Sequence, residues 1–146
     1  GTMAATPLSA LAGYYTIKQI YETNACERAN AMGDRLTAGL KQLIKKHDLP
    51  FVAFNQGSIC HLETVGTMHF AVNWKKPWNI PKVLHETSVR KAEMEHMGAA
   101  YMAEGLVTLA GSRLYTSAAY TEEKIDQALE AFDRVFSNVV KLKQQG

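Results

Sequence analysis

The sequence predicts an α+β domain, in which a small antiparallel sheet of three to four strands carries helices on one face. Two observations predict this class. Near both ends of the chain, apolar residues recur every three or four positions, which is the period of a helix buried along one side. Between these stretches, residues 51–74 divide at glycines into short segments, and the last segment alternates apolar and polar residues as a half-buried strand does.

The composition is that of one globular domain, with 146 residues of which 47% are hydrophobic and 21% charged. The net charge of +2 is spread along the sequence without the dense basic stripe that nucleic-acid binding needs. No apolar run approaches the roughly 18 residues of a membrane span. We therefore expect neither a nucleic-acid partner nor a membrane partner.

The first third of the chain predicts two helices. Residues 7–21 have apolar positions at helical spacing, and Pro7 suits a first helical turn, where its missing N–H is no loss. A second helix is expected to begin at Thr23 or Asn24, either of which can cap it, and to stop before Pro50. Its buried stripe comprises Ala25, Ala29, Met32, Leu36, Leu40, Leu43 and Ile44.

The middle of the chain predicts strands. Residues 51–56, 58–65 and 67–74 are extended in pattern, and a hairpin across Gly66 is the simplest pairing of the last two. Residues 75–81 contain two prolines, which lack N–H donors and restrict the residues before them, so this stretch predicts a loop.

The last part of the chain predicts a helix, a strand and a closing helix. Residues 83–104 are helical in pattern, with Gly105 as the C-cap, and residues 106–120 are extended. Thr121 is expected to cap the closing helix. The core stripe of that helix comprises Ile125, Leu129, Phe132, Phe136 and Val140.

The two cysteines and the histidines give no strong chemical signal. Cys26 and Cys60 lack zinc-type spacing, and we expect buried free thiols in a reducing cytoplasm, with a disulfide as the alternative. His61 and His69 can face one another across the predicted hairpin, where hydrogen-bonded sheet histidines are the simpler interpretation. No metal site is predicted. The sequence also lacks a nucleophile elbow, a Walker loop and a dinucleotide fingerprint.

Three stretches, taken in order and spacing, resemble one enzyme family. They are "GTMAATPLSALAG" (1–13), "CERANAMGDRLTAGLKQLIKKHDLPFVAFNQGSICHLET" (26–64) and "YMAEGLVTLAGSRLYTSAAYTEEKIDQALEAFDRVF" (101–136). Together they resemble the C-terminal portion of class III pyridoxal-phosphate-dependent aminotransferases, in particular the glutamate-1-semialdehyde 2,1-aminomutase branch. The resemblance is weakest over residues 66–85.

The resemblance implies a fold type I enzyme that transfers an amino group through a pyridoxamine form of pyridoxal 5'-phosphate. Residues 1–23 would be the helix connecting to a large domain upstream, and residues 24–146 the small C-terminal domain. The lysine that forms the Schiff base would lie upstream, so no catalytic residue is assigned here and the fragment is expected to be inactive alone. A homodimer and an amino acid or amino-aldehyde substrate are implied as well.

By the same resemblance, Gly1 and Thr2 would bind the cofactor phosphate. Thr2 would donate its hydroxyl, and Gly1 would allow close approach of the backbone near a helix start, where unpaired N–H groups favour an anion. Two other interpretations stay open. Gly1 and Thr2 can be an expression scar before an initiator Met3, and Thr2 can be a frayed terminal residue.

Arg113 is the candidate for binding a substrate carboxylate through its planar guanidinium, with pairing to a surface acid as the alternative. The sequence departs from the family pattern at several positions. Thr6 and Tyr120 replace the usual Asn and His, and Ser112 falls where the aminomutase branch has a glutamate. Ser112 therefore puts glutamate 1-semialdehyde in doubt as the substrate.

A second hypothesis is a stand-alone domain without catalysis that serves in association or binding. The lack of a complete catalytic set favours it, and apolar surface left exposed would cause self-association. The reading frame upstream of Gly1 separates the two hypotheses, because a start codon at Met3 would exclude the enzyme.

Overall fold

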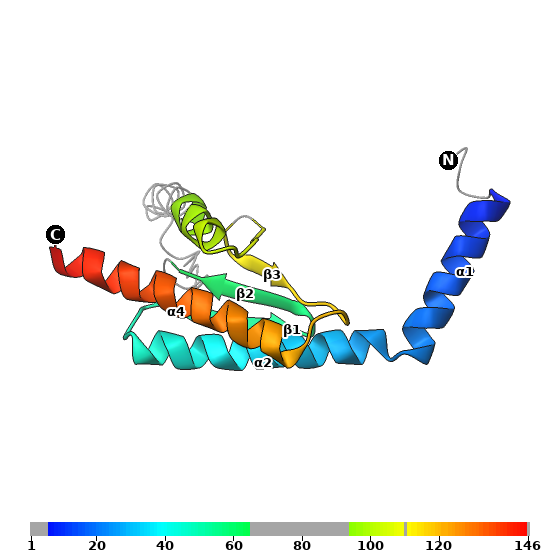
Figure 1. Cartoon of the computed structure of the whole chain (residues 1–146), viewed down its shortest axis with the longest axis horizontal. Helices are drawn as coiled ribbons and strands as arrows, with labels where there is room; N and C mark the ends of the chain where they lie inside the picture. Colours follow the sequence, from blue (N-terminus) through cyan, green and yellow to red (C-terminus); the bar gives the residue numbers. More distant parts are fainter. Residues whose placement is uncertain (1–5, 65–93, 110, 146) are drawn as a thin grey trace, which may run out of the picture.

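A computed structural model describes residues 6–64, 94–109 and 111–145 of the chain (Figure 1). The strands form one antiparallel sheet in the order β1-β2-β3, which confirms the predicted α+β class. In chain order the elements are α1 (Pro7–Glu22), α2 (Ala25–Lys46), β1 (Val52–Gln56), β2 (Ile59–Glu63), a helix over residues 94–103, β3 (Arg113–Tyr115) and α4 (Glu122–Gln145).

Helices α2 and α4 lie side by side against one face of the sheet (Figure 1). The apolar strand residues that point toward these helices are buried, because successive side chains of a strand alternate between its two faces; they are Ala53, Cys60, Leu62 and Leu114. Aromatic edges fill the layer between helices and sheet: Phe51 meets Phe136 at 5.3 Å between ring centroids, and Tyr101 meets Phe132 at 5.1 Å. The largest fully buried side chains are Tyr101, Phe132, Phe136, Leu40, Leu62 and Cys60.

The predicted start of the second helix and its N-cap position are correct, but the expected side-chain capping bond is not made. Asn24 is the N-cap residue, yet it adopts a left-handed conformation with φ 48° and its side chain makes no capping hydrogen bond. The Thr23 hydroxyl instead donates to the carbonyl of Gln19, 2.7 Å away, in the last turn of α1. Only two residues separate the helices, so both are used to end α1 and turn the chain. Thr121 does cap α4 as predicted, by accepting from the backbone N–H of Lys124 at 3.4 Å.

The described residues form a hairpin that was not predicted. β1 and β2 are joined by a turn at Gly57, which has a φ of 59°, and β3 pairs with the other edge of β2. The expected hairpin across Gly66 lies outside the described residues, as do the strand over 67–74 and the loop over 75–81. Of the expected helix over 83–104, the described part is helical to residue 103, and Gly105 follows it with a φ of 82°.

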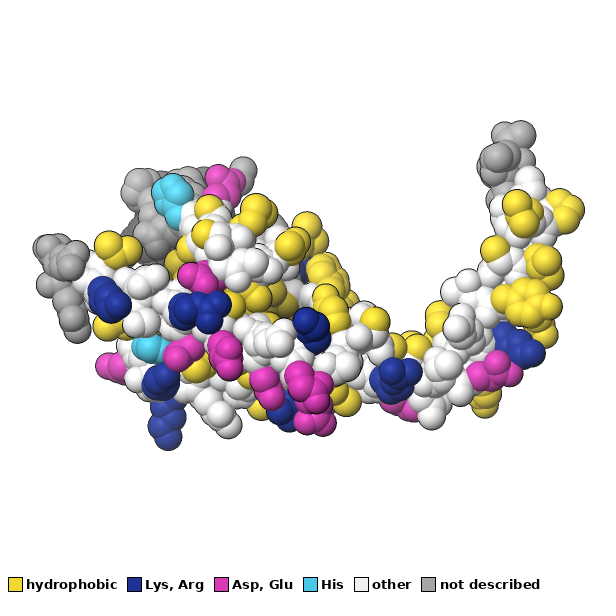
Figure 2. All heavy atoms as spheres, viewed as in Figure 1, with side chains coloured by type: hydrophobic (Ala, Val, Ile, Leu, Met, Phe, Trp, Pro, Cys, Tyr) yellow, Lys and Arg dark blue, Asp and Glu magenta, His cyan; other side chains and the backbone are white. Residues whose placement is uncertain are grey.

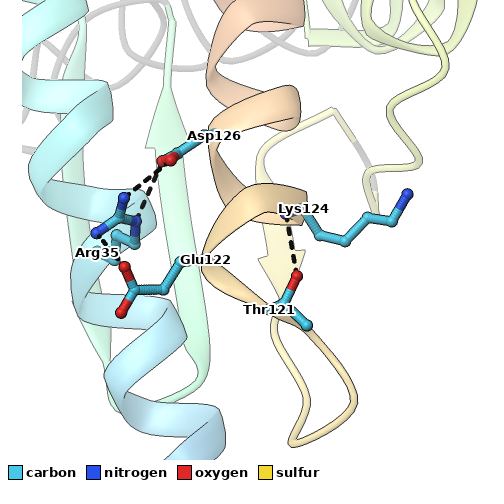
Figure 3. A network of polar contacts seen from close by, with 5 residues as sticks. All are labelled: Arg35, Thr121, Glu122, Lys124 and Asp126. Atoms are coloured by element: carbon cyan, nitrogen blue, oxygen red, sulfur yellow. Dashed lines mark hydrogen bonds and ion pairs between the residues drawn. The ribbon is translucent and has the colours of Figure 1, made fainter.

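Two clusters of charged side chains hold α2 and α4 together. In the first, Arg35 donates two hydrogen bonds to Asp126, of 2.9 and 3.1 Å, and also reaches Glu122 at 3.0 Å (Figure 3). The hydrogen bond to Asp126 raises the pKa of Arg35. This cluster therefore joins α2 to α4 through residues that are 91 positions apart in the sequence.

The second cluster lies at the end of α2. Lys46 donates to both carboxylate oxygens of Asp133, at 2.8 and 2.9 Å, and His47 Nε2 lies 2.6 Å from one of them. The hydrogen bonds from Lys46 and then from His47 lower the pKa of Asp133. None of the helices within the described ranges has the length and hydropathy needed to cross a membrane.

Replacing Gly33 with alanine is expected to destabilise the domain by about 1–3 kcal/mol, because the new β-carbon would overlap the backbone carbonyl oxygen of Gly57 where α2 crosses the hairpin. The matched control is Gly13→Ala in α1, where no atom lies within 4 Å and the change should stabilise the helix by at most about 1 kcal/mol. Urea unfolding measures both. Equal effects of the two substitutions would contradict the close packing at Gly33.

The pH dependence of stability should report the cluster at Asp133. Because its folded-state pKa is lowered, its contribution is present above the unfolded pKa of about 3.9 and is lost as the pH falls below that value. Asp133→Asn should therefore flatten the fall in unfolding free energy between about pH 5 and pH 2, with Asp48→Asn as the control. If the unfolding free energy of Asp133→Asn fell with decreasing pH as steeply as that of the original chain, Asp133 would not be the group responsible.

Candidate functional site

The face of the sheet that points away from α2 and α4 carries the candidate site. We call it the open sheet face, and its members alternate along the strands with the buried residues of the core. Large apolar side chains on it are only partly covered: Phe54 is 43% exposed, Ile59 40% and Tyr115 50%. By the strand register the open sheet face comprises Val52, Phe54 and Gln56 of β1, Ile59, His61 and Glu63 of β2, and Arg113 and Tyr115 of β3.

The strand register brings three of these side chains into one row. Phe54 on β1 pairs with His61 on β2, and His61 pairs with Arg113 on β3. The rings of Phe54 and His61 stack in parallel, with centroids 4.8 Å apart and an interplanar angle of 2°. Directly opposite residues on a sheet are neighbours at about 5 Å between β-carbons, so a guanidinium lies beside an aromatic pair. His61 therefore has Phe54 and Arg113 as its cross-strand neighbours, while His69 lies outside the described residues.

Arg113 is exposed, and no carboxylate of the described residues accepts a hydrogen bond from its guanidinium. The predicted alternative, a pair with a surface acid, is not seen within these ranges. Within the described ranges its planar donors are unpaired, and a carboxylate is a group that a guanidinium binds with two parallel hydrogen bonds. Tyr115 lies two residues along β3 from Arg113, and His61 separates Arg113 from Phe54 in the row, so exposed rings near the arginine suit the carbon skeleton of such a ligand.

The predicted phosphate-binding residues cannot be placed in the same way. Gly1 and Thr2 lie outside the described residues, so their role remains a prediction. The described chain begins at Thr6, and α1 begins at Pro7 in its first helical position, as expected. The hydroxyl of Thr6 donates to Ser9 at 2.7 Å.

The cysteines are both free, but their burial differs. Cys60 is fully buried and donates weakly to the carbonyl of Gly33 at 3.5 Å, and burial raises the pKa of its thiol. Cys26 is exposed, so the expectation of two buried thiols is wrong for this residue. It lies in the first turn of α2, before the helix reaches the sheet. Within the described part of the chain, no three side chains of the types that bind metals are grouped to hold an ion.

A pocket on the helix side of β3 was not foreseen from the sequence. Its volume is about 280 Å³, and buried side chains of the core form its floor, including Leu36, Ile125 and Phe132. Tyr120 and Lys124 line it as well. The residues that follow Gly105 and residues of α4 both line the pocket. The spacing of apolar residues in the sequence does not predict which of these segments lie next to each other.

Comparison with known proteins shows which proteins the chain is similar to. No family model matches the chain. The glutamate-1-semialdehyde 2,1-aminomutase 1 of Macrococcus caseolyticus is 30% identical over 138 residues, which is 91% of this chain and 29% of that protein. The enzyme of the same name from Staphylococcus aureus is 30% identical over 146 residues, with 97% and 31% covered. The predicted resemblance to the C-terminal part of this family is confirmed. The chain spans about 30% of the length of these curated relatives.

Solved structures agree on the fold. An omega-transaminase from Sphaerobacter thermophilus matches with a TM-score of 0.68 at 16% identity, over 91% of this chain and 28% of that one. The FumI protein of Sphingopyxis sp. MTA144, solved in its PLP internal aldimine form, matches with a TM-score of 0.61 at 24% identity, over 86% and 25%. The α+β architecture described above is therefore one that transaminases use for part of their chain.

The two sides of β3 should respond differently to substitution. Arg113→Ala is expected to change the unfolding free energy by less than about 0.5 kcal/mol, because the side chain is exposed and unpaired among the described residues. Leu114→Ala, one residue along, removes a side chain that is 7% exposed in the core and should cost about 2–4 kcal/mol. Thermal unfolding followed by circular dichroism compares them. A loss at Arg113 as large as at Leu114 would show a structural role for the arginine.

Proposed function

We propose that this chain is the C-terminal part of a class III pyridoxal-phosphate-dependent aminotransferase or aminomutase. The observation that carries the proposal is the 30% identity to glutamate-1-semialdehyde 2,1-aminomutases over 91–97% of the chain. The shared fold of transaminase structures supports it independently of sequence, since the identity there is only 14–24%. The reaction class is transfer of an amino group, within one molecule or between two.

The proposal assigns residues 1–23 to the connection with a large domain and residues 24–146 to the small domain. Two features of the structure support this division. Helix α1 buries none of its residues, whereas α2 and α4 share one core with the sheet. The left-handed Asn24 marks the boundary between them. The proposal includes a homodimer in the cytoplasm.

The described residues fit a substrate-binding role better than a complete cofactor site. Pyridoxal 5'-phosphate, when bound, supplies an electron sink for bonds to the amino-bearing carbon. A lysine that binds it covalently is normally held in an enclosed site that lowers its pKa. Every lysine of the described residues with a defined side chain is exposed on a helix: Lys18, Lys41, Lys45, Lys46, Lys124 and Lys141. This supports a covalent lysine elsewhere, with Gly1 and Thr2 proposed at the cofactor phosphate.

We assign the substrate carboxylate to Arg113. It is the cation of the open sheet face, and it lies beside the stacked pair of Phe54 and His61. Ser112, where the aminomutase branch has a glutamate, is buried, and its carbonyl accepts a hydrogen bond from the N–H of Leu62 at 2.8 Å. The backbone there is fixed by the sheet, while the side chain carries no charge. The proposed substrate is therefore an amino acid or amino-aldehyde, without assignment of glutamate 1-semialdehyde.

The test of this function is amino transfer by the complete product of the reading frame that encodes the chain. In an assay with pyridoxal phosphate and a set of amino donors, Arg113→Gln should raise the KM for carboxylate substrates at least tenfold. The control is Arg28→Gln, which should leave that KM unchanged. Arg28 lies on α2 and donates a hydrogen bond to the carbonyl of Ala118. Unchanged KM values would remove Arg113 from the site. A product that starts at Met3 and transfers no amino group would favour the association domain instead.

The isolated chain should form no specific covalent adduct with pyridoxal phosphate. After borohydride reduction, peptide mass spectrometry is expected to find low labelling spread over exposed lysines such as Lys45 and Lys124, because none of the described lysines lies in an enclosed site. One lysine modified stoichiometrically would contradict the proposal that the covalent site lies outside this chain.

A further inference from the structure

The pocket on the helix side of β3 has an apolar floor and an exposed apolar rim. Its floor belongs to the core, since Leu36, Ile125 and Phe132 are all buried. At its rim, Val107 is 83% exposed and Tyr120 47%. Figure 2 shows hydrophobic side chains in a hollow between α4 and the segments above it in the view. An apolar group that entered the pocket would therefore remove both the floor and the rim from water.

Hydrogen bonds hold two walls of the pocket in place. On one wall, the hydroxyl of Thr116 donates to the carbonyl of Ala29 at 2.7 Å, and its backbone N–H donates to the carbonyl of Ser58 at 2.9 Å. On another wall, the N–H of Leu106 donates to the carbonyl of Tyr101 at 2.9 Å. A ligand therefore meets walls that are already ordered, and loop ordering is one of the main costs of association.

The volume and the lining of the pocket limit what it can hold. Small-molecule pockets usually measure roughly 300–1,000 Å³, and this one, at about 280 Å³, suits a molecule with one ring and a short chain. Aromatic side chains line it, namely Tyr115, Tyr120 and Phe132. Aromatic rings pack well against one another edge-to-face or with an offset, so the lining favours an aromatic ligand.

One cation at the pocket has no acidic partner. Lys124 is exposed, lines the pocket, and donates to the side-chain oxygen of Gln127 at 3.1 Å. Within the described ranges, no carboxylate forms an ion pair with Lys124. An ammonium has three N–H donors, so donors remain for a ligand beyond the bond to Gln127.

The neighbouring acids of α4 do not neutralise this cation. Glu122 and Asp126 both pair with Arg35 of α2, at 3.0 and 2.9 Å. Figure 3 shows these two carboxylates turned toward Arg35, while Lys124 extends to the opposite side of α4. Neither they nor Glu123 belong to the lining of the pocket, where Lys124 is the charged side chain among the described residues. The pocket therefore combines an apolar interior with a single positive charge.

We propose that this pocket binds a small aromatic monocarboxylate, with the ring on the apolar floor and the carboxylate on the ammonium of Lys124. A phosphate monoester carries up to two negative charges and would find no second basic group in the described lining. The site is distinct from Arg113, which lies on the open sheet face. The proposal requires neither pyridoxal phosphate nor amino transfer, so it stands or falls separately from the proposed function.

Titration of the isotope-labelled chain with 3-phenylpropionate, followed by the backbone amide signals in two-dimensional NMR, tests the proposal. Saturable shifts are expected at lining residues such as Gly105, Val107 and Ala128, with a Kd of about 1 mM or below for a ligand of about eleven non-hydrogen atoms. The neutral amide, 3-phenylpropionamide, should bind at least about fivefold more weakly, because it lacks the charge. Acetate has the charge but no ring, and it should not saturate.

Four substitutions locate the site. Lys124→Gln should weaken binding of 3-phenylpropionate at least about fivefold and leave binding of the amide unchanged, because it removes only the charge. Ala128→Leu should abolish binding of both compounds, because the larger side chain would fill the pocket that Ala128 lines. Lys141→Gln, on the same helix but outside the lining, is the matched control and should change neither. Arg113→Gln should change neither as well, since the open sheet face is a different site.

The NMR spectrum of each variant also reports whether it is folded, and if Ala128→Leu does not fold, the exposed Lys124 decides through Lys124→Gln. Shifts that do not saturate by about 10 mM 3-phenylpropionate overturn the proposal. Equal affinity for the acid and the amide overturns it too, because the charge would then play no part. Loss of binding in Arg113→Gln with Lys124→Gln unaffected would place the carboxylate on the open sheet face instead.

Discussion

The packing of α2 and α4 against one face of the sheet is the constraint on which the rest of this structure depends. Leu40, Phe132 and Phe136 are fully buried where the two helices and the sheet meet. Burying side chains of this size contributes about 1.5–3 kcal/mol each, more than any exposed ion pair of the helix pair can supply. The charged clusters around Arg35 and Asp133 then fix how the two helices align.

Because the helices cover only one face of the sheet, the open sheet face and helix α1 lie outside the core. A three-stranded sheet covered by helices on one side turns every second strand residue the other way, so Phe54, His61 and Arg113 share a face without contributing to the core. Helix α1 is likewise free of the core. Residues on these surfaces can therefore change while the fold persists, which agrees with a fold shared with solved structures at 14–24% identity.

The local sequence pattern predicted the helices better than it predicted which strands pair with each other. The spacing of apolar residues located α2 and α4 because each has one buried side, and Thr121 was recognisable as a cap. The hairpin at Gly57 was not predicted, because turns at Gly57 and at Gly66 are equally plausible from sequence and the pairing of β2 with β1 and β3 is visible only in three dimensions. The stack of Phe54 on His61 was missed for the same reason.

The candidate site shows the same limit. Arg113 was singled out from a family resemblance, and its freedom from any acid of the described residues became visible only in three dimensions. The bond between Arg35 and Asp126 joins residues 91 positions apart, a separation at which helical periodicity carries no information. Gly1 and Thr2 stay predictions, since they lie outside the described residues.

Hydrogen exchange of backbone amides in the isolated chain tests most directly that one closed face holds the domain together. The account predicts that amides of β2, of α2 around Leu40 and of α4 around Phe132 exchange with one common free energy, equal to that of global unfolding. Exchange of α4 at a free energy well below that of α2 and β2 would contradict it, because the helix pair and the sheet would then not form a single cooperative unit.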